Sequence, residues 1–201
     1  MDQVLPPSTT RTELLRSARS LFAAHGYAGT SIAAIAQDLG VTKQALLHHF
    51  GNKDALYAMA VEQTAAEVLA VLFDALEDDR PAEDQLETFC AHLSQRMAQD
   101  PAPAKLLLRE MLDHALTPKA EGRSFATLLE SLVATVQATE RWKEGGVQGA
   151  LALVCHLFGA AVLAHGARDT IGGLFGPAAE IGARDQNAAV FAALVSGALR
   201  G

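Results

Sequence analysis

The sequence predicts an all-α protein made of a small N-terminal helical domain and a larger helical body. Half of the residues are hydrophobic but only 5% are aromatic, and the abundance of alanine and leucine favours helices. No long stretch alternates between apolar and polar residues as a half-buried strand would. At 201 residues, the chain is long enough for one small and one medium-sized core.

The first helix is predicted to begin near Thr10, which has capping-box spacing to Glu13. It should end at residues 25–29, a run that contains two glycines. Its apolar face consists of Leu14, Leu15, Ala18, Leu21 and Phe22. Residues 1–8 contain two prolines and no apolar run, so we expect a disordered lead-in there and not a signal peptide.

Residues 30–53 predict two short helices that meet at Gly40. Either Thr30 or Ser31 can cap the first helix, and Gly40 can adopt the left-handed conformation that ends it. Thr42 can cap the second helix. The inward positions of the two helices are Ile32, Ile35, Ala36, Leu39, Leu46 and Phe50, and the outward positions of the second are Lys43, Gln44, Leu47 and His48.

This arrangement predicts a helix-turn-helix, which presents its second helix to the major groove of DNA. Lys43 can hydrogen-bond guanine or take a phosphate, and Gln44 can pair with an adenine edge. His48 can reach a base or the backbone, and Leu47 can touch a thymine methyl group. Sequence-specific binding then requires two copies about 34 Å apart, on a palindromic double-stranded DNA operator.

A third helix is predicted directly after this pair. Asn52 can cap it and place Lys53 in its first turn. A helix N-terminus with an ammonium group beside it is a natural phosphate site. The complete set of predicted DNA contacts is Thr30, Ser31, Thr42, Lys43, Gln44, Leu47, His48, His49 and Lys53.

The stretch from Arg11 to Val61, about a quarter of the chain, resembles the N-terminal domain of the TetR/AcrR family of transcriptional regulators. The matching segments, in order, are residues 14–18, 21–22, 25–27, 30–32, 35–36, 39–43, 46–50 and 52–56. The chain departs from the family at Leu47, where a tyrosine that can bind phosphate is often found. The resemblance implies that His49 braces the turn or touches phosphate. It also implies a homodimeric regulator, mostly of the repressor kind, and no enzyme.

The charge distribution agrees with a DNA-binding N-terminal part. The net charge is −7, yet residues 9–60 carry five basic and three acidic side chains, so the acidity lies in the remainder. An excess of only two positive charges predicts that affinity depends on two domains per complex and is sensitive to salt. We therefore predict a DNA-binding domain over residues 9–56 and a body for ligand binding and dimerisation over residues 57–201.

The body is predicted to be helical throughout. Helices are expected from about Asp54 to Leu76, from about Ala82 to Gln99, and from Pro101 to about Leu116. Pro118 marks the next break, after which a helix is expected to continue to about Trp142. The inward residues expected in the second and third of these are Leu86, Phe89, Cys90, Leu93, Met97, Ala104, Leu107, Leu108, Met111, Leu112 and Ala115. Cys90 and Cys155 are expected to be small core residues in a reducing cytoplasm.

Two late segments, residues 147–167 and 186–199, contain no charged side chain. Such helices must be buried all round, so we expect two of them from each of two subunits to form a four-helix interface. The bulky faces are Val147, Leu151, Val154, Phe158 and Val162 in the first, and Val190, Phe191, Leu194, Val195 and Leu199 in the second. The small-residue face is Gly149, Ala152, His156, Gly159 and Ala160. A membrane span is the rival interpretation, disfavoured by the polar residues and glycines in the first segment.

The connection between these two segments contains Gly172-Gly173 and Gly176-Pro177, which we interpret as breaks. It lacks the Lys-Ser/Thr pair of a P-loop and a preceding strand. No HExxH sequence, Cys/His cluster or nucleophile elbow occurs, so no metal, cofactor or catalytic residue is predicted. An all-helical enzyme is therefore the least favoured function.

The resemblance makes a small-molecule effector pocket in the body an expectation. The sparse polar groups of such an apolar cavity would be His92, Glu110, His114 and His156. The apolar body favours a lipophilic ligand, and its acidic balance favours a polar or cationic group on that ligand. The alternative is a helix-turn-helix regulator that lacks a pocket and is controlled by a protein partner.

Overall fold

The structure, a computed structural model, describes residues 11–113 and 123–201, with the backbone alone at residues 113 and 177–185. Every regular element in these ranges is a helix, which confirms the predicted fold class. The helices are α1 Arg11–Gly29, α2 Ile32–Asp38, α3 Lys43–Phe50, α4 Lys53–Leu76, α5 Ala82–Gln99, α6 Ala102–Asp113, α7 Ser124–Gln137, α8 Gly146–Gly166, α9 Arg168–Phe175 and α10 Pro177–Arg200. Thr10 and the predicted lead-in, residues 1–8, lie outside the described residues.

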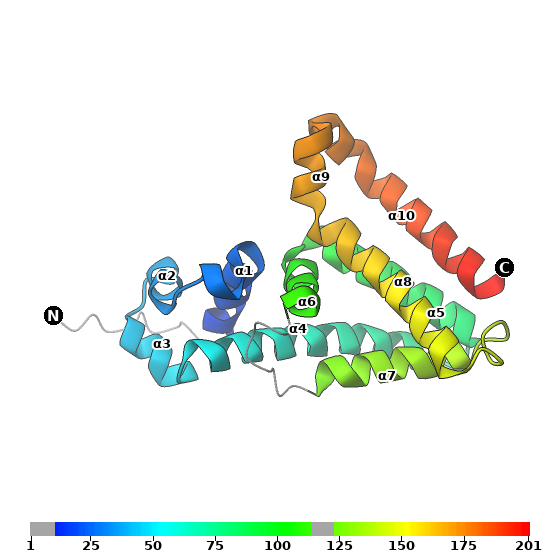
Figure 1. Cartoon of the computed structure of the whole chain (residues 1–201), viewed down its shortest axis with the longest axis horizontal. Helices are drawn as coiled ribbons and strands as arrows, with labels where there is room; N and C mark the ends of the chain where they lie inside the picture. Colours follow the sequence, from blue (N-terminus) through cyan, green and yellow to red (C-terminus); the bar gives the residue numbers. More distant parts are fainter. Residues whose placement is uncertain (1–10, 114–122) are drawn as a thin grey trace.

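A small N-terminal head consists of α1, α2, α3 and the first turns of α4 (Figure 1). Its core joins the predicted apolar faces of the first three helices to residues of α4, namely Leu56, Tyr57, Ala60 and Val61. Leu46 and Phe50 of α3 are buried in this core, as predicted. The head therefore uses the N-terminal part of α4 to complete its core, and α4 continues without interruption into the body.

The predicted ends of the head helices are confirmed. The side chains of Ser31, Thr42 and Asn52 each accept a hydrogen bond from the backbone N–H three residues later, at the starts of α2, α3 and α4. Gly40 has a φ of 65°, the left-handed conformation expected at the turn between α2 and α3. Gly26, with φ 73°, kinks α1 within the run predicted to end the helix.

The body packs α4 to α8 and the second half of α10 around one core. The predicted bounds of α5 hold, and its five predicted inward residues are buried. In α6, Ala104 and Leu107 are buried, but Met111 and Leu112 are 46% and 75% exposed, because α6 turns the neighbouring face with Leu106 into the core of the head. Ala115 and the predicted end of this helix at Leu116 lie outside the described residues.

Three further expectations were wrong. The helix predicted to reach Trp142 ends at Gln137, and turns follow it. Gly172 and Gly173 do not break the chain but lie inside a short helix, α9, while Gly176, with φ 82°, and Pro177 do mark a break. Cys90 is buried, and this burial raises the pKa of its thiol to about 12. Cys155 is exposed, since it lies on the outer side of α8.

The last two long helices bury only one side each. Val154, Phe158 and Val162 of α8 are buried, but Val147 and Leu151 are exposed. On α10, the buried residues are Phe191, Val195 and Leu199, whereas Val190 and Leu194 are 59% and 56% exposed. By length and composition both α4 and α8 could cross a membrane, with half of the α4 window and a third of the α8 window buried inside the protein.

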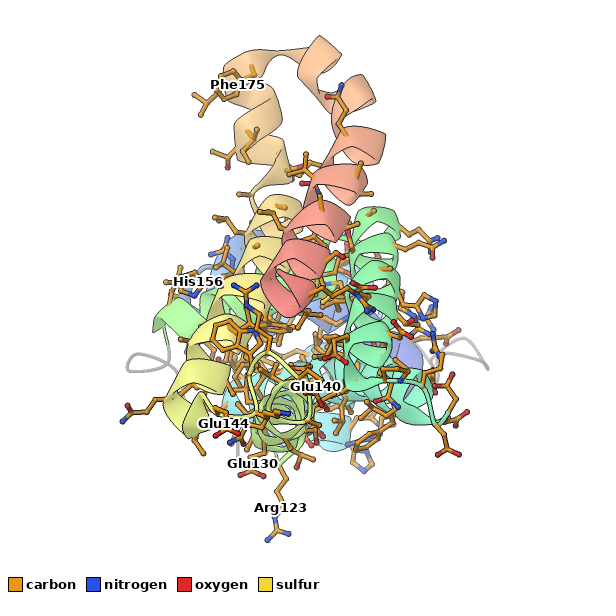
Figure 2. All side chains as sticks on the ribbon, turned by 90° about the vertical axis from the view of Figure 1, so that its right-hand side faces the viewer. Arg123, Glu130, Glu140, Glu144, His156 and Phe175 are labelled. Atoms are coloured by element: carbon orange, nitrogen blue, oxygen red, sulfur yellow. The ribbon has the colours of Figure 1, made fainter. Side chains whose placement is uncertain are left out.

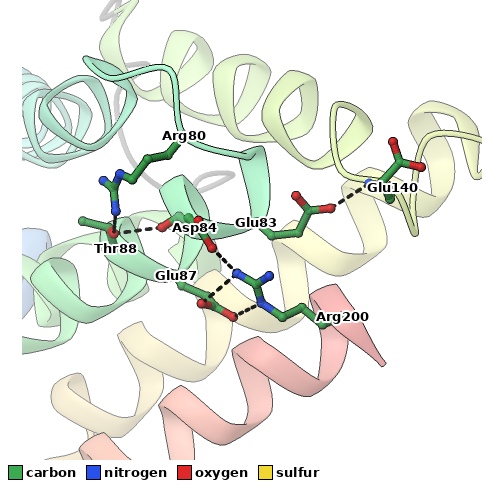
Figure 3. A network of polar contacts seen from close by, with 7 residues as sticks. All are labelled: Arg80, Glu83, Asp84, Glu87, Thr88, Glu140 and Arg200. Carbon is green, nitrogen blue, oxygen red and sulfur yellow. Dashed lines mark hydrogen bonds and ion pairs between the residues drawn. The ribbon is translucent and has the colours of Figure 1, made fainter.

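The helix α9 and the start of α10 project beyond the rest of the body as an arch (Figures 1 and 2). Phe175 stands at the tip of this arch, and none of the side chains of α9 is buried. The opposite end of α10 is anchored to the start of α5 (Figure 3). There, Arg200 pairs with Asp84 and with Glu87, whose Oε1 lies 2.9 Å from the arginine Nε. Trp142 adds a hydrogen bond from its ring N–H to the Ala198 carbonyl, at 2.9 Å.

Candidate nucleic-acid interface and ligand cavity

The outer side of α3 is free for contact with a partner. Lys43, Gln44, His48 and His49 are exposed, and Leu47 is half-buried. The Thr42 hydroxyl oxygen accepts from the Ala45 N–H at 3.1 Å, which fixes the first turn of the helix. Because Leu46 and Phe50 anchor the opposite side in the head core, α3 presents these polar side chains on a rigid helix. Side chains of this kind can read base edges in a major groove.

Lys53 lies at the N-terminus of α4, as predicted. Its ammonium nitrogen stands 4.1 Å from the centroid of the Tyr27 ring, a cation–π contact. The Tyr27 hydroxyl donates a hydrogen bond to Asp54, and this bond raises the pKa of Tyr27. The Tyr27 ring therefore holds the Lys53 ammonium near the N-terminus of α4, an arrangement suited to a phosphate.

Thr30, Ser31 and Thr42 have local structural roles. Thr30 is buried, and its hydroxyl donates to the Gly26 carbonyl at 2.8 Å, so it closes the kinked end of α1 and cannot contact DNA by its side chain. We therefore remove Thr30 from the set of predicted side-chain contacts. Ser31 and Thr42 are exposed but use their oxygens as caps. Only a backbone or hydroxyl-donor contact remains open to them.

Of the four residues predicted to line an effector pocket, the three that the structure describes do not come together. His92 is exposed on α5, and His156 points outward from α8, with its Nδ1 2.7 Å from the Ala152 carbonyl (Figure 2). Glu110 is buried between head and body, where it accepts a hydrogen bond from Tyr57 at 2.9 Å. His114 lies outside the described residues.

A cavity of about 820 Å³ does exist in the described part of the body, between α5 and α10 and beside the end of α8. Its lining residues are Glu87, Cys90, Ala91, Ser94, Gln95, Ala98, Gln99, His165, Arg168, Ala188, Phe191, Ala192, Val195 and Ser196. None of His92, Glu110 and His156 is among them. The volume lies within the range of small-molecule sites, about 300–1,000 Å³.

The polar pair inside this cavity is Ser94 and His165. Both are buried, and the Ser94 hydroxyl lies 3.1 Å from His165 Nε2. Burial, together with the charge of Arg168, lowers the pKa of His165, so its imidazole is neutral at pH 7. Sequence reasoning missed this pair because 71 residues separate its members. The sequence did contain one indication of the cavity. Small residues recur three or four positions apart on α5, from Cys90 to Ala98, and such a helix face leaves space beside it.

The sequence of the head matches a known family. A family model described as "Bacterial regulatory proteins, tetR family" matches residues 14–60, which are the head helices and the start of α4. This N-terminal domain belongs to the TetR family. The TetR match thus covers α3 and its caps, the part that the sequence singles out for DNA binding.

Curated TetR-type relatives are similar mainly over the same region. The HTH-type transcriptional repressor AcnR of Corynebacterium glutamicum is 35% identical over 66 residues, 33% of this chain and 35% of that protein. The HTH-type transcriptional regulatory protein RaaS of Mycobacterium tuberculosis is 28% identical over 131 residues, 61% of each chain. The chain thus spans about a third of the length of the AcnR proteins that it matches. Both relatives are named as transcriptional regulators.

Solved structures extend the similarity to the whole fold. A TetR transcriptional regulator from Legionella pneumophila superposes with a TM-score of 0.71 at 14% identity, over 97% of this chain and 100% of that chain. A TetR-like regulator from Rhodococcus sp. RHA1 gives 0.69 at 18% identity, over 98% and 100%. The helical body therefore shares its fold with these regulators, at low sequence identity.

Proposed function

We propose that the protein is a sequence-specific DNA-binding transcription regulator, a cytoplasmic repressor released from a palindromic operator by a small lipophilic ligand. The observation that carries the proposal is α3, a capped helix with Lys43, Gln44 and His48 exposed, in a TetR-type head. We retain residues 9–56 as the DNA-binding domain and 57–201 as the body. The partners are double-stranded DNA, a second copy of the chain and a small-molecule effector.

A homodimer is supported by the outward faces of α8 and α10. Val147, Leu151 and Leu163 of α8 and Val190 and Leu194 of α10 are exposed large apolar residues, which a soluble monomer seldom gathers on neighbouring helices. Covering these faces by a two-fold partner would form the four-helix interface expected from the sequence. Two heads per dimer would also compensate for the modest positive charge of each one.

Regulation by a small molecule is supported by the cavity between α5 and α10. The alternative, a regulator controlled only by a protein partner, requires no such internal space. A thermal-shift screen of the purified protein against lipophilic compounds separates the two functions. A stabilising compound that also weakens operator binding supports the repressor with an effector, and a regulator without a pocket gives neither result.

Selection of bound fragments from the source genome with the purified full-length protein tests DNA binding directly. We expect enrichment of promoter fragments that share an inverted repeat, with half-sites about one helical turn apart. The amount of DNA retained by the protein should fall steeply from low to moderate salt concentration. The reason is that each contact with a phosphate releases counterions, and a higher salt concentration opposes this release. Recovery of random fragments without a shared repeat would contradict sequence-specific binding.

On the selected operator, Gln44→Ala and Lys53→Ala should have different effects. Gln44→Ala should change the base preference at one position in each half-site, because its amide can read a base edge. Lys53→Ala should weaken binding to all sequences alike and reduce the salt dependence, because its ammonium faces phosphate. Binding measured on a library of operator variants distinguishes these outcomes.

Gln137→Ala is the matched control for Gln44→Ala, because Gln137 is a half-buried glutamine at the end of α7, outside both the head and the cavity. This control should leave both base preference and affinity unchanged. A Gln44→Ala protein with an unaltered preference at every operator position would show that α3 is not placed in the groove as proposed.

A further inference from the structure

We propose that the ligand of the cavity between α5 and α10 is an amphipathic organic anion, with an apolar chain along the groove and a carboxylate at Arg168. This inference rests on the proposed function, since it names the chemical class of the effector. It replaces the cationic ligand that the acidic balance of the body favoured. The charged groups that line the cavity itself favour an anionic ligand, as the following contacts of Glu87 and Arg168 indicate.

The cavity is elongated. Lining residues on α5 occupy four successive turns, from Glu87 to Gln99, and α10 supplies the facing wall from Ala188 to Ser196. The α5 stretch from Glu87 to Gln99 spans twelve residue steps, about 18 Å of helix at 1.5 Å per residue. Its middle part is lined by small and apolar side chains, namely Cys90, Ala91, Phe191, Ala192 and Val195. This shape and surface suit a linear apolar chain.

One end of the cavity is electrically neutralised. Among the lining residues that the structure describes, Glu87 is the only acidic one, and it accepts a hydrogen bond from Arg200 Nε at 2.9 Å. This bond lowers the pKa of Glu87, and the carboxylate remains paired within the protein. The pair links α10 to α5 at this end of the cavity (Figure 3). A cationic ligand would find no unpaired acid here.

The other end holds Arg168, for which the described part of the chain supplies no ion-pair partner. Arg168 follows α8 and donates from one terminal nitrogen to the Ala98 carbonyl at 3.0 Å, near the end of α5. The adjacent Asp169 pairs instead with Lys105, and no carboxylate among the described residues forms an ion pair with Arg168. A guanidinium has five N–H donors, so donors remain for a bound anion. Arginine favours carboxylates because two parallel hydrogen bonds can form.

The buried Ser94–His165 pair lies at the same end as Arg168. Ser94 precedes Ala98 by one helical turn, and His165 precedes Arg168 by three residues. The pair offers hydroxyl and imidazole groups in an otherwise apolar wall, where they can orient a polar head group. The apolar centre, the neutral end at Glu87 and this polar cationic end together suit an amphipathic anion.

Calorimetric titration of the DNA-free full-length protein tests the ligand class. The probe is dodecanoate, kept below its micelle-forming concentration, and the comparison compounds are dodecanol and dodecyltrimethylammonium. We expect dodecanoate to bind at least about tenfold more tightly than either comparison compound. The reason is that hydrogen bonds between a guanidinium and a carboxylate are stronger than those between a guanidinium and a neutral hydroxyl group. Equal affinity for the alcohol, tighter binding of the cation, or no binding of dodecanoate would overturn the proposal.

Three variants locate the site. Arg168→Gln should weaken dodecanoate binding about tenfold and leave dodecanol unaffected, whereas Arg168→Lys should retain most of the affinity. Arg96→Gln is the matched control, because Arg96 is an exposed arginine of α5 that does not line this cavity. Ala192→Phe should abolish binding of both compounds by filling the groove. Unchanged dodecanoate affinity in Arg168→Gln would place the carboxylate elsewhere, and thermal melting confirms that each variant is folded.

A gel shift on the selected operator, with and without dodecanoate, separates failure of this inference from failure of the proposed function. Operator binding without dodecanoate binding overturns the ligand class alone. Dodecanoate binding by a protein that retains no DNA overturns the regulator and leaves the ligand site intact.

Discussion

The Val190→Glu, Leu194→Glu double variant is expected to be a monomer that binds the operator at least about 100-fold more weakly than the natural protein. Both side chains are more than half exposed on the outer face of α10. Two carboxylates there would have to lose their hydration without a partner when a second subunit docks. Light scattering coupled to size-exclusion chromatography gives the mass, and a gel shift gives the affinity.

Phe73→Glu is the control for this double variant, because it places a carboxylate at an exposed apolar position of α4, away from α8 and α10. It should remain dimeric and bind DNA as before. If the double variant keeps the mass of a dimer, the subunits associate through another surface.

Leu46→Ala is expected to destabilise the head by about 2–5 kcal/mol, the cost of removing a leucine from a closed core. Leu46 has no exposed surface and lies among residues of α1, α2 and α4. The core of the head is small, so this loss should unfold α1–α3 and abolish DNA binding while the body stays helical. Hydrogen exchange resolved along the chain measures the two parts separately.

Leu47→Ala is the matched control, one position along α3 and half-buried on the outer side. Its head should keep nearly full protection from exchange, since little buried surface is lost. Its operator affinity would then report only the proposed contact of Leu47 with DNA. Equal loss of protection in both variants would mean that the faces of α3 are wrongly assigned.

The head could be predicted almost residue by residue because its signals are local. Ser31, Thr42 and Asn52 each bond to an N–H three residues later, and such caps are visible in sequence order. Gly40 needs a left-handed conformation whatever packs around it. Thr30 was misassigned because its hydroxyl bonds backward to Gly26, at a kink that the sequence predicted only as a helix end.

The ligand residues of the body could not be predicted in the same way. Periodicity indicates which residues share a face of a helix, but not which helix that face meets. His92 and His156 have suitable chemistry and face outward, while Ser94 and His165 meet only through the packing of α5 on α8. Glycine at 172 and 173 lowers helix propensity without preventing α9.

Arg109 of α6 is hydrogen-bonded directly to the head. From α6, its Nε donates to the Ala23 carbonyl at 3.1 Å and a terminal nitrogen donates to the Ala24 carbonyl at 3.0 Å, near the kink of α1. A methyl group at Gly26 would come within 3.0 Å of this guanidinium. The same helix also packs on α8, and Lys105 of α6 forms an ion pair with Asp169 of α9. A tilt of α6 would therefore also displace the end of α1, to which Arg109 is bonded. The two recognition helices of a dimer would then change their spacing whenever α6 is displaced.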